Sequence, residues 1–229
     1  MEAGVSQSGR AGLWSAVAEV AWKELRVEWR SRYALSASVL FAVVTLVAIT
    51  VSLGPAAARG EAAAALLWIV LLFAATAALG HSYGREVDGG TWDFLRQNAA
   101  PSAVLFGKWL GALAVLLPLE AFILLLGSWL SPPVVGHPVG FAAILLLGGV
   151  SLALALPLVS AVLLRSRRHG GLTAALAFPL VLPSVLASVL GTRRAFAGEW
   201  PDGEVRLLLA FTGVLLIAGW ILFEHLFED

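Results

Sequence analysis

The sequence predicts an all-α protein that crosses a membrane with six helices and keeps both termini in the cytoplasm. Of its 229 residues, 59% are hydrophobic and only 13% are charged, against about 25% charged in a typical soluble domain. Six stretches each hold the roughly 20 mostly apolar residues that a helix needs to cross the hydrocarbon layer. Too little polar sequence remains to cover the core of a soluble protein. The predicted spans are 33–53, 62–80, 108–130, 141–164, 171–190 and 205–223, within a membrane domain 33–223.

The segment 1–32 precedes the first span and predicts an amphipathic helix lying at the inner membrane interface. Its apolar residues recur at helical spacing and include Trp14, Trp22, Leu25 and Trp29. Charged residues occupy much of the remaining surface. An alternative is a solvated helix that docks on another subunit. The first span is expected to act as an uncleaved membrane anchor.

Lysine and arginine are distributed unevenly between the two sides of the predicted membrane domain. The N-terminal segment and the second and fourth loops together carry 11 of them, and the opposite side carries 4. Because cytoplasmic loops are enriched in these residues, the side with 11 is predicted to be cytoplasmic. The short acidic tail 224–229 then also lies in the cytoplasm.

The second loop is the most specific part of the sequence. Acidic residues precede a Gly-Thr turn, a short amphipathic helix follows, and Pro101 ends it before the third span begins at Lys108. Thr91 is placed to cap this short helix. The helix is suited to a groove in a cytoplasmic partner, and the alternative is an ordinary loop helix at the interface. The residues concerned are Glu86, Asp88, Gly90, Thr91, Trp92, Asp93 and Leu95.

This loop resembles the coupling segment of ABC-2 type permeases, which receives the push of an ATPase. A second motif, at the fourth loop and fifth span, resembles the haem exporter protein B family, the membrane subunit of the cytochrome c maturation ABC complex. Its residues are Arg168, Gly170, Gly171, Pro179 and Pro183. The resemblance covers nearly the whole chain. The doubled Gly89-Gly90 departs from the pattern, in which one glycine would suffice, and puts the shape of that turn in doubt.

The resemblance implies a permease subunit in the inner membrane that works with a separate cytoplasmic ATPase, which binds the ATP. It also implies a second permease copy and other cytochrome c maturation subunits as partners. Haem is a possible substrate, and no cofactor is expected to be bound directly. Two alternatives stay open: an ABC-2 exporter of lipid, polysaccharide or drug, and a non-transporting assembly scaffold in the membrane.

The chain itself is not expected to be an enzyme. Gly107-Lys108 resembles the end of a nucleotide-binding loop, but Ser102 stands where a glycine is needed and Trp109 where a hydroxyl is needed. Lys108 is therefore interpreted as an anchor at the lipid interface. The absence of cysteine excludes disulfides and cysteine-ligated metals, and a net charge of zero gives no reason to expect nucleic acid.

Several residues within or beside the spans raise further hypotheses. Glu120 lies well inside the third span and is expected either to pair with a basic residue such as Arg206 or to line a polar cavity. His137 is the one histidine predicted to face outward, but a loop histidine is usually solvated, so no metal ligand is predicted. Gly107 and Gly111 form a GxxxG motif that permits a close helix approach. Kinks are expected at Pro118, Pro157, Pro179 and Pro183.

Overall fold

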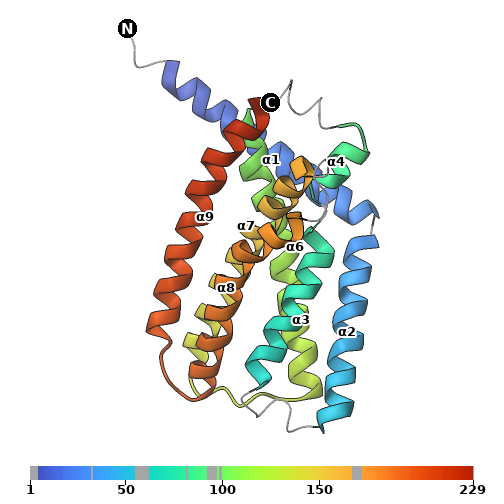
Figure 1. Ribbon diagram of the computed structural model, residues 1–229, viewed down its shortest axis with the longest axis vertical. Coiled ribbons are helices and arrows are strands. Elements are labelled where there is room, and N and C mark those ends of the chain that lie inside the picture. Colours follow the sequence, from blue (N-terminus) through green and yellow to red (C-terminus); the bar gives the residue numbers. More distant parts are fainter. Residues whose placement is uncertain are drawn as a thin grey trace.

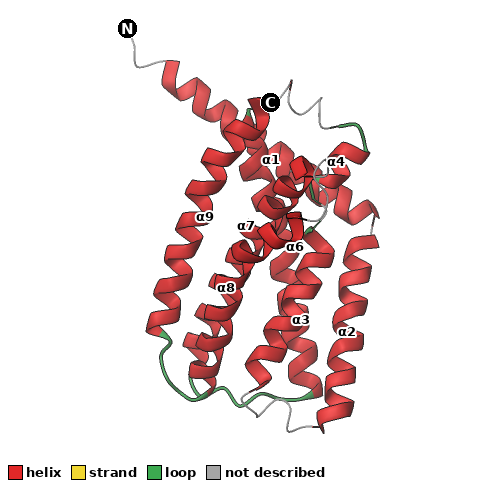
Figure 2. Ribbon diagram, in the orientation of Figure 1, coloured by secondary structure: helices red, strands yellow, loops and turns green. Residues whose placement is uncertain are grey.

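The computed structural model describes most of the chain, and the described residues form helices and their connections without strands. Described are residues 5–31, 33–54, 62–80, 82–91, 97, 100–166 and 172–228. Within these ranges the side chains of 5–11, 29–34, 85, 88, 163–178 and 224–228 are not described. Figure 2 shows the helices in red and their connections in green. The prediction of an all-α protein is confirmed for this part of the chain.

The long helices run side by side as a bundle (Figure 1). Its elements are α1 (Val5–Ser31), α2 (Tyr33–Leu53), α3 (Ala62–Leu79), α4 (Gly84–Asp88), α6 (Pro101–Leu130), α7 (Pro138–Ser166), α8 (Leu172–Phe196) and α9 (Asp202–Glu228). Helix α1, the short α4 and the end of α9 lie at one end, which we call the α4 end. The connections from α6 to α7 and from α8 to α9 lie at the opposite end.

Five helices in the described part of the chain are long and apolar enough to cross a membrane. They are α2, α3, α6, α7 and α9. Helix α8 is not among them, although it packs along α7 and α9. These helices make the chain a multi-pass membrane protein, while the count of six spans and the orientation stay predictions.

The boundaries of the first two predicted spans agree with the structure, but the start of the third does not. Helix α2 has the predicted bounds, and α3 ends one residue before the predicted Gly80. Helix α6, however, begins at Pro101 rather than at Lys108. Proline is tolerated there because it lacks an N–H and the first turn of a helix leaves N–H groups unbonded. The short helix that Pro101 was predicted to end falls on residues outside the described part.

Helix α7 is the centre of the bundle and contacts α3, α6, α8 and α9. Every residue from 151 to 161 is buried. Polar side chains in this interior bond to each other: Trp68 Nε1 donates to Thr192 Oγ1 at 2.9 Å, and the hydroxyls of Ser151 and Thr212 lie 2.8 Å apart. Such bonds between helices satisfy groups that lipid cannot. All four predicted prolines lie inside α6, α7 or α8.

Candidate functional site

The GxxxG motif at the start of α6 is the surface on which α1 docks. A Cβ atom at Gly107 would lie 2.5 Å from Val20 Cβ, and one at Gly111 would lie 2.8 Å from Glu24 Cβ. Both contacts are shorter than real Cβ atoms allow, so only glycine lets α1 come this close. The predicted close approach is confirmed. Its partner is the N-terminal helix, which thereby becomes part of the bundle.

Lys108, one residue after Gly107, is fully buried beneath α1. Its Nζ lies 2.7 Å from Glu24 Oε1 and 3.3 Å from Glu86 Oε1, and it donates to the Ser82 carbonyl at 3.2 Å. These three acceptors match the three donors of an ammonium group. The interpretation of Lys108 as a lipid-interface anchor was wrong, because carboxylates from α1 and α4 hold its charge inside the protein.

Glu86 on α4 is the shared partner of the cluster. Lys23 Nζ on α1 lies 2.6 Å from Glu86 Oε1, and the Thr91 hydroxyl donates to Glu86 Oε2. Burial raises the pKa of Glu86, but the charge of Lys108 and the bonds from Lys23 and Thr91 outweigh it and lower the pKa to about 2. The carboxylate therefore stabilises the fold above its ordinary pKa of 4.5, and this contribution is lost as the pH falls through about 2. We call Lys23, Glu24, Glu86, Thr91 and Lys108 the Lys108 cluster.

The turn after α4 places Thr91 against Glu86. The Gly90 N–H donates to the Val87 carbonyl at 3.1 Å, and the Thr91 N–H donates to the Glu86 carbonyl at 2.9 Å. These two bonds form a Schellman motif, which needs a residue with positive φ at its end. Gly90 has φ 66° and fills that position. The second glycine of the doubled pair is therefore the one that this turn requires.

Tyr83 connects the cluster to two further helices. Lys108 Nζ lies 4.7 Å from the centre of the Tyr83 ring, a cation–π contact. The Tyr83 N–H donates to Ser160 Oγ on α7 at 3.1 Å, and its ring lies 5.6 Å from that of Phe223 on α9. Burial, followed by the charges of Glu24 and Glu86, raises the pKa of Tyr83 well above 10.0. The phenol is therefore neutral. Together, Glu86 and the adjacent Tyr83 connect the α4 segment to α1, α6, α7 and α9.

The structure brings some of the predicted site residues together and leaves others outside the described part. Glu86 and Thr91 belong to the Lys108 cluster, and Gly90 forms the turn that positions Thr91. Asp88 ends α4, and its side chain lies outside the described part. Sequence reasoning missed Lys23, Glu24 and Lys108 as site residues. The predicted residues that lie outside the described part are Trp92, Asp93, Leu95, Arg168, Gly170 and Gly171. The predicted capping of the short helix by Thr91 therefore stays a prediction.

The helix predicted for the N-terminal segment is present as α1 (Val5–Ser31), while its place at the membrane interface stays a prediction. Trp14 and Trp22 are exposed on it, as expected of side chains that face lipid headgroups, and Leu25 is half-buried. The side chain of Trp29 lies outside the described part. The opposite face, with Val17 and Val20, is buried against α6. Docking on α6 explains why the helix lies across the α4 end of the bundle (Figure 1).

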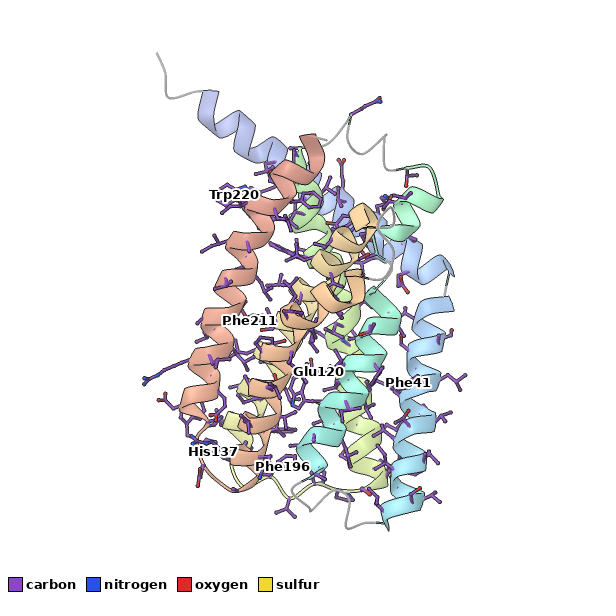
Figure 3. All side chains as sticks on the ribbon, viewed as in Figure 1. Phe41, Glu120, His137, Phe196, Phe211 and Trp220 are labelled. Carbon is purple, nitrogen blue, oxygen red and sulfur yellow. The ribbon has the colours of Figure 1, made fainter. Side chains whose placement is uncertain are left out.

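The structure contradicts the pairing expected for Glu120, whereas the alternative of a polar cavity stays a prediction. Pairing of Glu120 with Arg206 was wrong: Arg206 is exposed and pairs with Asp202, one turn away on α9, at 2.9 Å. Glu120 is buried in the interior of the bundle (Figure 3). Pro179 is exposed and Pro183 is half-buried on α8.

The side chain of His137 caps the start of α7. It directly precedes α7, and its Nδ1 accepts a hydrogen bond of 2.9 Å from the Gly140 N–H. This bond occupies Nδ1 of the ring with a backbone donor at the start of α7. Its ring also lies 5.5 Å from that of Trp200. The described residues contain no group of three or more His, Cys, Asp or Glu side chains placed to hold a metal ion.

Replacing His137 with alanine is expected to lower the free energy of unfolding by about 1 kcal/mol, the usual effect of losing a helix N-cap. Asparagine is the matched control, because its side-chain oxygen can accept the same Gly140 N–H. Thermal unfolding of the purified protein measures the difference. Equal stability of the alanine and asparagine variants would show that His137 does not act as a cap.

An apolar cavity of about 260 Å³ lies at the end opposite α4. Helices α2, α3 and α6 line it, together with Phe141 and Phe196. Its volume is below the roughly 300–1,000 Å³ of typical ligand pockets. Its lining carries no charged group. The Lys108 cluster, at the other end, is therefore the stronger candidate for function.

The paired charges of the Lys108 cluster connect three helices. Lys108, which is fully buried, joins α4 and α1 to the first turns of a long apolar helix. No curated protein and no solved structure matches the chain. The family model for the CcmB protein matches residues 15–223, which include the cluster and all five apolar helices. The chain therefore belongs to the CcmB family, the haem exporter protein B family.

Proposed function

We propose that this protein is the permease subunit of an ABC transporter complex in which a separate cytoplasmic ATPase pushes on the α4 segment. Membership in the CcmB family implies a membrane component of haem export for cytochrome c maturation, together with an ATPase partner. ATP hydrolysis then takes place on that partner. The chain crosses the inner membrane six times, with α8 as the fifth span in addition to the five apolar helices, and its α4 end faces the cytoplasm.

The Lys108 cluster is the observation that carries this proposal. A force applied to α4 reaches Glu86, which is bonded to Lys108 on α6 and to Lys23 on α1. Lys108 is fully buried between Glu86 of α4 and Glu24 of α1. Separating these charges is strongly unfavourable, so the three helices move together. The contacts of Tyr83 with Ser160 and Phe223 extend the same unit to α7 and α9.

The mechanism follows from this connection. Closure of the ATPase on binding ATP displaces α4 and the segment 92–95, and the cluster converts this displacement into a shift of α6. Since α6 packs on α2, α3, α7 and α9, its shift changes the packing of the bundle. That change either moves haem across the membrane or releases a haem-loaded chaperone from a neighbouring subunit. A second permease copy completes the complex.

Val87 provides a test of the docking surface. It lies on α4, is 44% exposed and has an apolar side chain that suits a protein contact. Val87→Glu is expected to reduce the amount of co-purifying ATPase roughly tenfold or more. A carboxylate in an apolar contact costs more than the ~1.4 kcal/mol that a tenfold change requires. The measurement is the ratio of the two subunits after purification of the complex in detergent.

Val134→Glu is the matched control. Val134 is also an exposed valine, at 62%, but it lies at the opposite end of the bundle, between α6 and α7. The proposal predicts normal ATPase binding for this variant. If Val134→Glu loses the ATPase and Val87→Glu binds it normally, the ATPase binds at the end opposite α4, and the proposed orientation is wrong.

A further inference from the structure

Glu120 is a buried carboxyl group that the Lys108 cluster does not use. It lies on α6 inside the bundle (Figure 3), and its residue is only 4% exposed. Its Oε1 has no hydrogen-bond partner. Its Oε2 lies against Gly149 of α7, at a place that the Cβ of any other residue would occupy. The carboxyl group thus fits into a space that glycine leaves open in the central helix.

No positive charge in the described part of the chain lies beside this carboxyl. Helices α2 and α3 and residues 138–162 of α7 contain no Asp, Glu, Lys, Arg or His. Lys108 is 12 residues earlier on α6, or about 18 Å along the helix. It pairs with Glu24 and Glu86 at the α4 end.

The remaining described charges on neighbouring helices lie at the opposite end. Arg193 and Arg194 are exposed near the end of α8, and Arg194 pairs with Glu204. Arg206 pairs with Asp202 near the start of α9. The charges of α1 lie at the α4 end. An ionised carboxylate at position 120 would therefore be buried with no counter-charge among the described side chains, which is strongly unfavourable in the interior of a membrane protein.

A second polar group borders the same part of α7. Ser188 on α8 is fully buried, and its Oγ has no hydrogen-bond partner. A Cβ at Gly148, next to Gly149, would lie 2.5 Å from this oxygen. Gly148 and Gly149 therefore lie against two buried polar side chains, those of Ser188 and Glu120. A hydroxyl group is neutral, and a protonated carboxyl group at position 120 would be neutral as well.

We propose that Glu120 is a proton-binding site inside the bundle. In the described arrangement the carboxyl group holds its proton, and it releases the proton only when α6 shifts against α7 and admits water or a cation beside Gly149. The protonation of Glu120 in the resting protein goes beyond the proposed function and does not depend on it. Only the release of the proton rests on the shift of α6 in the proposed function.

Infrared spectroscopy of the full-length protein at neutral pH tests the proposal, in a detergent without ester groups so that no lipid carbonyl band overlaps. A protonated carboxylic acid has a carbonyl stretch that is separate from the bands of ionised carboxylates and of the backbone. The wild type is expected to show this band, Glu120→Gln to lose its intensity, and Glu120→Asp to retain it at a shifted frequency. A wild-type spectrum without the band, or an identical band in Glu120→Gln, would overturn the proposal.

Thermal stability gives a second measurement, with Glu86→Gln as the matched control. Glutamine has the shape of a neutral glutamic acid, so Glu120→Gln is expected to fold and to melt at the wild-type temperature at neutral pH. Glu86 is ionised and paired, so Glu86→Gln is expected to melt at a lower temperature. If Glu120→Gln loses as much stability as Glu86→Gln, a neutral group does not fit this site as the proposal requires, and the proposal is wrong.

Discussion

Replacing Lys108 with methionine is expected to lower the free energy of unfolding by about 3–5 kcal/mol, the usual cost of removing one partner from a buried ion pair. Methionine retains much of the lysine side chain's length and volume but has no charge. Glu24 and Glu86 then face each other without the ammonium group that lies between them at 2.7 and 3.3 Å. Thermal unfolding of the purified protein measures the loss of stability. The level of mature c-type cytochromes in cells measures the loss of function.

Lys23→Met is the matched control for this prediction. Lys23 also pairs with Glu86, but its side chain is 35% exposed, so water screens the pair and supports the charges that remain. Its loss is expected to cost about 1 kcal/mol or less. Combining Lys108→Met with Glu86→Gln is expected to cost less than the sum of the two single changes, because each removes the same interaction. Additive effects, or equal effects of Lys23→Met and Lys108→Met, would contradict the cluster as described.

Much of the fold could be predicted because lipid imposes a simple rule on the sequence. A helix that crosses hydrocarbon must be apolar over a fixed length, and this rule gave α2 its observed bounds from composition alone. The GxxxG motif likewise predicted a close contact from Gly107 and Gly111. It did not identify α1 as the partner, because spacing within one helix says nothing about which helix packs against it.

The Lys108 cluster could not be predicted because its parts are far apart in the sequence. Glu24 and Lys108 are separated by 84 positions. A lysine near the start of an apolar helix ordinarily extends to the lipid headgroups, and only the docking of α1 gives it an internal partner. The predicted pairing of Glu120 with Arg206 was wrong because the sequence did not show which partner Arg206 would choose. Local pairing with Asp202, four residues away, already holds Arg206.

Substituting Gly107 with valine is expected to separate α1 from α6 and to abolish function. A Cβ at this position would lie 2.5 Å from Val20 Cβ and 3.1 Å from the Val17 carbonyl oxygen. Because that oxygen belongs to the backbone of α1, a change of side-chain rotamer does not remove the conflict, and the whole helix must move. Glu24, which is on α1, then leaves Lys108. The substitution combines overpacking, typically about 1–3 kcal/mol, with the loss of a buried ion pair.

Gly213→Val is the control that separates this effect from a general intolerance of valine at glycine positions. Gly213 lies within α9, and a Cβ there would meet nothing within 4 Å. Valine also has a higher helix propensity than glycine, so no loss of stability is expected at this position. Protease cleavage within α1 should become faster in Gly107→Val and remain slow in Gly213→Val. If α1 is equally protected in both variants and c-type cytochromes mature normally, α1 does not need its contact with Gly107, and the connection from α4 to α6 does not pass through it.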